Sequence, residues 1–277
     1  MSDDFILNVQ NNNFLRITAF GIEHLENAPC MIFVHGFKGF KDWGFVPYIG
    51  KYFSKQGYFV LTFNFSHNGI GANLIDFDEL DKFAENKFSL EISELNELIQ
   101  AYNFGIFGNP SGKGIGLLGH SRGGAISLLA GSKSEEIKAI CTWATVSYFD
   151  RYTDRQKNVW REKGYTEILN TRTKQKMRLN ISLLEDIETN KDGSLNIEQA
   201  VINLNKPLLI CHAENDLAVP FKEAETLFGW SNKNKTDLLI VPATGHTFDV
   251  KHPFEGSNKK FDFLMKETST FFNTNLN

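Results

Sequence analysis

Short apolar stretches of strand length alternate with longer stretches of helical periodicity along most of the chain. This alternation is typical of a mostly parallel sheet that helices cover on both faces. The apolar stretches predict strands at 30–36, 58–65, 114–120, 137–146, 207–213 and 237–243. Apolar residues three and four positions apart predict helices at 46–57, 88–103, 122–133, 220–230 and 259–272. We therefore expect an α/β fold.

The N-terminal stretch 5–21 has a different pattern, because apolar and polar residues alternate on both sides of an asparagine cluster. Alternation with a period of two is typical of strands that bury one face. Asparagines between two such stretches favour a turn. We therefore expect two antiparallel strands before the parallel part of the fold begins.

One connection is much longer than the others. From Ser147 to about Asn205 no strand is evident, whereas strand-helix connections in such folds are usually about two to six residues long. We interpret residues 147–205 as a cap inserted over the C-terminal edge of the sheet. The core then consists of residues 1–146 and 206–277.

Composition and charge restrict the classes of partner. The chain has 277 residues, of which 42% are hydrophobic and 22% charged, which is ordinary for a globular protein with a sizeable core. The formal net charge is −4 and no basic tract occurs, which argues against nucleic acid as a partner.

The N-terminus lacks the pattern of a secretory signal, and no apolar run reaches membrane-spanning length. We expect a soluble, cytoplasmic protein with no membrane partner, and the sequence does not specify its oligomeric state.

The three cysteines, Cys30, Cys141 and Cys211, lie in or beside predicted strands, at spacings that match no zinc site. We expect them to be small buried residues. None of them lies in a turn framed by glycines, which disfavours a cysteine nucleophile.

The motif GHSRG places Ser121 between a predicted strand and a predicted helix. At so sharp a turn the backbone is strained and neighbouring segments come very close. Gly119 and Gly123 have no Cβ atoms that would collide there. The turn raises the Ser121 hydroxyl above the sheet edge, which favours a nucleophile over a simple glycine-rich strand end.

A serine hydroxyl needs a histidine to take its proton and a carboxylate to orient that histidine. Among the seven histidines we favour His246, because it lies in a glycine-containing loop after the last predicted strand. His252 is a secondary candidate because it is close to His246. His120 is adjacent to the serine and is expected to point away from it. His35 is expected to have a structural hydrogen-bonding role.

The predicted carboxylate is Asp216, which follows a buried strand and precedes a proline that opens a helix. Glu214 is its close rival. The chain order Ser121, Asp216, His246 is the order of nucleophile, acid and base in α/β-hydrolases. Three such residues at three strand ends are more specific than the pentapeptide alone.

An oxyanion hole requires backbone donors where negative charge develops on the attacked carbonyl. The amide of Arg122, which follows the nucleophile, is one candidate. The other is the amide of Phe37 in the segment FVHGFKG, because Gly36 allows this loop to turn inward.

The segments HGFKG, GHSRGG, HAENDLAVP and GHTF stand in this order between about residues 30 and 250. They resemble the serine α/β-hydrolases of the dienelactone hydrolase-like and acyl-esterase or feruloyl-esterase-like branch. The resemblance implies an eight-stranded, mostly parallel sheet, an acyl-serine intermediate and no cofactor. It implies that Ser121 attacks an ester or thioester carbonyl while His246 acts as base and Asp216 orients it. The cysteine nucleophile of some dienelactone hydrolases is not matched.

Substrate contacts are harder to predict. Aromatic residues near expected loops are candidates for an acyl or aryl pocket, or else belong to the core: Trp43, Trp143, Tyr148 and Phe248. The segment 150–178 is rich in Arg and Lys, and such a cap could attract an anionic small-molecule substrate. A solvated helical surface is the better explanation for any one of these charges.

Residues 188–199 resemble an EF-hand loop, with Asn190 and Asp192 at ligand positions. Glu188 replaces the usual first aspartate and Gln199 replaces the bidentate glutamate. We interpret this segment as a polar turn in the cap and predict no metal site, with metal binding as the alternative.

Two other functions stay open. A peptidase of the prolyl oligopeptidase-like group is the neighbouring hypothesis, and the lack of a long N-terminal propeller region argues against it. A non-catalytic binding protein with this fold is a further alternative, but it has no physical need for an intact Ser121, Asp216 and His246.

Overall fold

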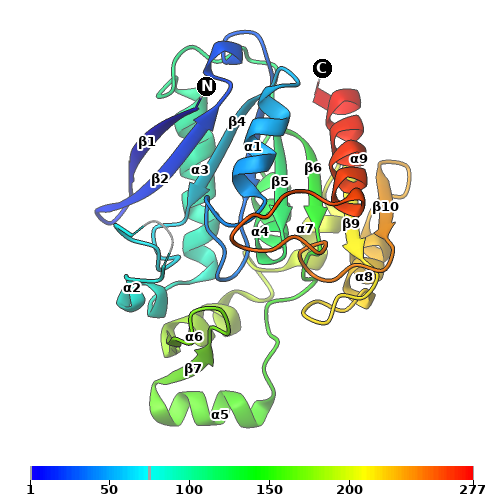
Figure 1. The fold of residues 1–277 in the computed structure, drawn as a ribbon. Helices are drawn as coiled ribbons and strands as arrows, with labels where there is room; N and C mark the ends of the chain where they lie inside the picture. The colour runs from blue at the N-terminus through cyan, green and yellow to red at the C-terminus, as the bar shows by residue number, and fades with distance from the viewer. Residues whose placement is uncertain (1, 74–75, 277) are drawn as a thin grey trace.

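The computed structural model describes residues 2–73 and 76–276, which fold around one eight-stranded sheet (Figure 1). The strand order is β1-β2-β4-β3-β5-β6-β9-β10. The pairs β1/β2 and β2/β4 are antiparallel, and all other neighbours in this sheet are parallel. The strands are β1 Ser2–Val9, β2 Asn13–Phe20, β3 Cys30–Val34, β4 Phe59–Asn64, β5 Ile115–His120, β6 Ile137–Trp143, β9 Leu208–Ala213 and β10 Thr236–Val241. The predicted mostly parallel eight-stranded sheet is thus confirmed.

The N-terminal hairpin is also confirmed. β1 pairs with β2 in register from Ser2↔Phe20 to Val9↔Asn13. Asn11 and Asn12 in the turn have φ values of 59° and 57°, a left-handed conformation that asparagine tolerates better than most residues.

Helices cover both faces of the sheet, at the stretches whose periodicity predicted them (Figure 1). Successive strand residues point to opposite faces, so the core is divided into two apolar layers. Residues such as Ile32 and Leu117 pack in the layer beneath α3, α4 and α8, and Phe33 and Leu118 pack in the layer beneath α1 and α9. The helices are α1 Val46–Ser54, α3 Phe88–Asn103, α4 Arg122–Gly131, α8 Lys222–Trp230 and α9 Lys259–Leu276, with the short η1 Ile22–His24 and α2 Leu80–Ala84.

The segment between β6 and β9 departs from the prediction, because it contains two strands. β7 (Tyr165–Leu169) and β8 (Lys176–Asn180) form an antiparallel hairpin outside the main sheet. Its strands carry many charged residues, and only Met177 and Leu179 are buried, so neither strand forms an apolar run. The remaining elements of the segment are α5 Asp154–Lys163, α6 Ile181–Asn190 and α7 Ile197–Ile202.

The segment 147–205 is not uniform in its packing. α5, β7 and α6 project below the sheet (Figure 1). α7, in contrast, packs against α4 and α8 of the core. Between residues 2 and 276, leaving aside 74 and 75, no helix is both long and apolar enough to cross a lipid bilayer.

Candidate active site

Ser121 lies at the turn from β5 into α4, with φ 56° and ψ −123°. Such a conformation is strained for a residue with a Cβ atom and is held by its surroundings. A Cβ atom on Gly119 would lie 2.5 Å from the carbonyl oxygen of Gly123, and one on Gly123 would lie 2.2 Å from that of Val34. The two glycines therefore let the turn pack against itself and against β3, as the sequence predicted.

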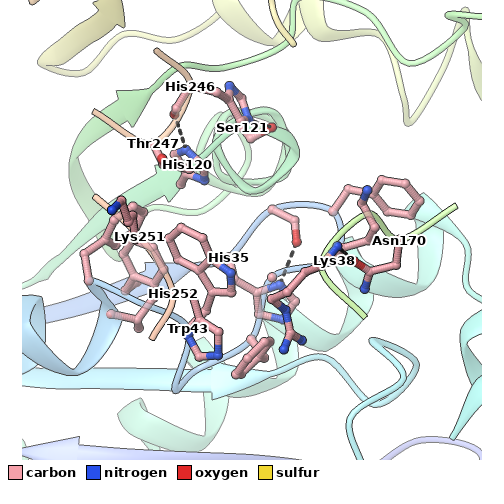
Figure 2. Close-up of a pocket in the computed structure, with 18 of the residues that line it drawn as sticks. His35, Lys38, Trp43, His120, Ser121, Asn170, His246, Thr247, Lys251 and His252 are labelled. Carbon is pink, nitrogen blue, oxygen red and sulfur yellow. Dashed lines mark hydrogen bonds between the residues drawn. The ribbon is translucent and has the colours of Figure 1, made fainter. Parts of the chain in front are cut away.

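The side chains of Ser121, His246 and Asp216 form one chain of hydrogen bonds. Nε2 of His246 lies 3.0 Å from Oγ of Ser121, and its Nδ1 lies 2.7 Å from Oδ2 of Asp216. Figure 2 shows His246 beside Ser121 at the edge of a cavity. When Nδ1 donates to the carboxylate, Nε2 is an acceptor for the serine hydroxyl proton. The three residues predicted from three strand ends are therefore brought together.

Asp216 is held as a carboxylate. Its side chain is buried, and its Oδ1 accepts hydrogen bonds from the amides of Ala218 at 2.8 Å and Val219 at 2.9 Å. Burial raises the pKa of Asp216, but the hydrogen bond and charge of His246 and these two amides outweigh it, so the pKa is below its usual value. The rival Glu214 accepts instead from the amide of Ala243 at 2.8 Å.

Two other histidines beside the site have backbone partners. His120 is hydrogen-bonded through Nε2 to the carbonyl of His246 at 3.0 Å, and burial lowers its pKa to about 3. Nδ1 of His252 accepts from the amide of Gly44 at 2.9 Å, and its ring stacks on Trp43. These contacts leave His246 as the histidine that is hydrogen-bonded to Ser121.

The loop after β3 approaches Ser121 closely. A Cβ atom on Gly36 would lie 2.9 Å from Cβ of Ser121, so only glycine allows this approach. His35 fixes the loop, since Nδ1 donates to the carbonyl of Gly36 at 2.9 Å and Nε2 accepts from the amide of Phe65 at 3.3 Å. The loop thereby holds Phe37 beside Ser121, and both residues line the same two cavities.

Arg122 begins α4, so its amide has no carbonyl partner within the helix. Its guanidinium runs back under the site, 4.6 Å from the centre of the Phe37 ring and 5.2 Å from that of Phe88. There it forms a 2.7 Å ion pair with Glu91 of α3, which is 1% exposed. Glu91 is not among the site residues predicted from the sequence. Its position three residues after Phe88 and four before Leu95, on the apolar side of α3, is the signal that marks it.

Two cavities meet at Ser121, with volumes of about 560 and 310 Å³. Trp43 lines the larger cavity and Tyr148 the smaller, as predicted for pocket residues. Trp143 and Phe248 line neither and are 0% exposed. Trp143 packs under α9 instead, where its Nε1 donates to Oγ1 of Thr268 at 3.1 Å. The expectation that Trp143 and Phe248 contact substrate is therefore corrected: both belong to the core.

The EF-hand-like segment 188–199 lies between α6 and α7. Nδ2 of Asn190 donates to the carbonyl and to Oδ1 of Asp186, each at 3.0 Å. In the part of the chain that the structure describes, no group of three His, Cys, Asp or Glu side chains is arranged to hold a metal ion.

Comparison with solved structures gives many similar folds. Est1E from Butyrivibrio proteoclasticus, in the structure with bound ferulic acid, is 17% identical, with 98% of each chain covered and a TM-score of 0.74. The α/β-hydrolase GrgF from Penicillium sp. sh18 is 16% identical, covering 100% of this chain and 99% of that one, with a TM-score of 0.73. The α/β-hydrolase domain-containing protein 10 from mouse is 16% identical, covering 98% and 99%, with a TM-score of 0.74.

A search of curated protein sequences gives no match. The family comparison does, because residues 109–270, more than half of the chain, match the prolyl oligopeptidase family. This range includes Ser121, Asp216 and His246. The chain therefore belongs to the prolyl oligopeptidase family, within the serine α/β-hydrolase superfamily, and is a hydrolase.

Proposed function

We propose that the protein hydrolyses a carboxylic ester or thioester through an acyl-serine intermediate. The observation that carries the proposal is the unbroken chain of hydrogen bonds from Ser121 through His246 to Asp216 at a strained turn. Because the hydroxyl already lies within hydrogen-bond distance of Nε2 of His246, its proton has an acceptor when Oγ attacks a carbonyl.

In the acylation half of the reaction, Oγ of Ser121 bonds to the carbonyl carbon while Nε2 of His246 takes the hydroxyl proton. The amides of Phe37 and Arg122 hydrogen-bond the resulting oxyanion. The tetrahedral centre then collapses, and His246 gives its proton to the departing alcohol or thiol. Water repeats these steps on the acyl-serine, which releases the acid and restores Ser121.

The ester preference has support from the structural comparisons. Est1E has been solved with ferulic acid, and another similar structure is an esterase domain from Rhodothermus marinus. The two cavities on either side of Ser121 suit a substrate with a substantial group on each side of the scissile bond.

A peptidase is the second candidate, and the match to the prolyl oligopeptidase family favours it. The same Ser121, His246 and Asp216 serve amide cleavage, except that His246 then protonates an amine. The leaving group therefore distinguishes the two candidates, and the nucleophile does not.

The test uses p-nitrophenyl esters, acyl-CoA thioesters and prolyl p-nitroanilides with the wild type and Ser121→Ala. Ser134→Ala, beyond the end of α4, is the matched serine control. We expect ester hydrolysis by wild type and Ser134→Ala and at least a ~10³-fold loss in Ser121→Ala. Cleavage of the anilides at a higher kcat/KM than the esters would replace the esterase by the peptidase.

Covalent labelling tests the nucleophile independently of the substrate. A fluorophosphonate should modify Ser121, as located by peptide mass spectrometry, and should leave folded Ser121→Ala unmodified. A folded wild type that the probe does not label, and that cleaves no member of the panel, would instead indicate a binding protein.

A further inference from the structure

The cavities beside Ser121 are lined by cationic side chains and, among the described residues, by no carboxylate. This bias does not follow from composition, because the chain has 33 acidic and 29 basic residues. The cations are Lys38, Arg172 and Lys251 in the larger cavity and Lys38, Arg122 and Arg151 in the smaller.

Four of these five side chains already have an acidic partner, which largely cancels their charge. Two pairs are short and partly or wholly buried, Arg122 with Glu91 at 2.7 Å and Arg151 with Glu223 at 2.6 Å. The other two lie nearer the surface: Arg172 with Asp76 at 3.5 Å and Lys251 with Glu255 at 3.3 Å.

Lys38 differs from the other four. Within residues 2–73 and 76–276, no carboxylate lies within 4.0 Å of its Nζ. The side chain is half-buried, and burial lowers the pKa of its ammonium group. Its Nζ lies 5.7 Å from the centre of the Phe37 ring. A partly desolvated cation without a counter-charge gains most from an anion that enters with the ligand.

Lys38 lies where the two cavities meet. Lys38 lines both cavities, together with Ser121 and His246. Figure 2 shows Lys38 across the larger cavity from Ser121 and beside Asn170. Its backbone has φ 58°, a conformation that a lysine rarely adopts and that glycine or asparagine would adopt at lower cost. A lysine held there in spite of this strain points to a use for its side chain.

We infer that Lys38 binds a carboxylate of the substrate, so that the hydrolysed ester carries a free acid group away from the scissile bond. A single unpaired ammonium matches the single charge of a carboxylate better than the double charge of a phosphate monoester. The inference rests on the proposed ester hydrolysis and assigns the substrate class of the same site.

The experiment compares two p-nitrophenyl esters of glutaric acid, one with its second carboxyl free and the other with it methylated. The readout is the ratio of kcat/KM for the free acid over that for the methyl ester. In the wild type we expect a ratio of about 10 or more, which comes from a lower KM for the free acid. Added salt should reduce this ratio. Lys38→Met should lower it to about 1, whereas Lys38→Arg should keep most of it.

Lys251→Met is the matched control, because Lys251 lines the same cavity but is paired and mostly exposed. The kcat/KM ratio of this variant should stay within about twofold of the wild-type ratio. A wild-type ratio near 1 with both esters hydrolysed overturns the inference and leaves the proposed function standing. A ratio that survives in Lys38→Met, or falls equally in Lys251→Met, also overturns it.

If neither ester is hydrolysed, a binding measurement tests the role of Lys38 separately from the proposed ester hydrolysis. Calorimetry on Ser121→Ala should detect monomethyl glutarate more strongly than dimethyl glutarate, and Ser121→Ala/Lys38→Met should lose this difference. Equal binding of the two ligands, or binding of neither, counts against the role of Lys38 whatever the reaction is.

Discussion

The carboxylate of Glu91 and the guanidinium of Arg122 form a 2.7 Å ion pair behind the turn that carries Ser121, and both are largely buried. The pair connects α3 to the first residue of α4. Burial raises the pKa of Glu91, while Arg122 and a hydrogen bond from Asn86 oppose this rise. The turn that carries Ser121 is thus attached to the neighbouring helix through charge and not only through apolar packing.

Removing one partner of this pair should destabilise the fold severely. Arg122→Met leaves the Glu91 carboxylate buried with, among the described residues, only Asn86 as its partner, which should cost about 3–5 kcal/mol of unfolding free energy. Urea denaturation followed by circular dichroism measures it. The double variant Glu91→Leu/Arg122→Met should be more stable than Arg122→Met alone. If the double variant is instead the less stable of the two, the pair does not act as a buried charge pair.

The second prediction concerns the partner of His246. Asp216→Asn should lower kcat for an ester by about 10⁴-fold, because an amide does not stabilise the imidazolium or select the correct tautomer. Leu217→Ala is the control, since Leu217 is 98% exposed and adjacent in sequence, and it should change kcat less than about twofold. A loss below tenfold in folded Asp216→Asn would assign the orienting role to another residue.

Close packing around the serine turn gives a third prediction. Gly123→Ala places a Cβ atom 2.2 Å from a backbone oxygen of Val34, so we expect an unfolded or at least ~3 kcal/mol destabilised protein. Gly229→Ala, in α8, meets no atom within 4 Å and should stabilise by about 0.5–1 kcal/mol through helix propensity. Thermal unfolding of both variants checks the contrast, which similar melting temperatures would contradict.

The fourth prediction concerns pH. Burial lowers the pKa of His35 to about 4, from an ordinary value of 6.5. The unfolded chain therefore binds a proton between these values that the folded protein excludes, so stability is present above pH 6.5 and is lost as pH falls toward 4. Protonation of His35 alone should lower the free energy of unfolding by about 2 kcal/mol between pH 7.5 and pH 5.

His35→Gln isolates this contribution. Its free energy of unfolding, from urea titrations at pH 7.5 and 5, should fall by about 2 kcal/mol less than that of the wild type over the same interval. An equal fall in both proteins would show that His35 is protonated in the fold.

Much of the fold follows from the sequence because most of its parallel strands are buried on both faces. Such strands are continuous apolar runs, and all six predicted in the α/β part are present. The hairpin of β7 and β8 has no such signal, since it lies at the periphery and half of its residues face solvent. Its existence depends on packing against α2, which local sequence does not encode.

The residues of the site differ in the same way. Ser121 and His246 can be predicted from the local sequence, because each lies in a glycine-containing turn or loop that follows a predicted strand. Trp143 and Phe248 are pocket candidates in the sequence because they stand near expected loops, but whether such a residue faces a cavity or the core depends on strand register and the next turn. Lys38 stands in the quoted HGFKG segment, yet its significance appears only when the pairing of every other cation around the cavities is known.

The two cavities share four lining residues, Phe37, Lys38, Ser121 and His246, and differ in all the others. Substitutions among the unshared residues therefore alter one chamber at a time. Selection, natural or in the laboratory, is free to reshape the fit for one half of the substrate while the fit for the other half and the bond-breaking groups stay unchanged. The two chambers are therefore separable targets for the engineering of specificity.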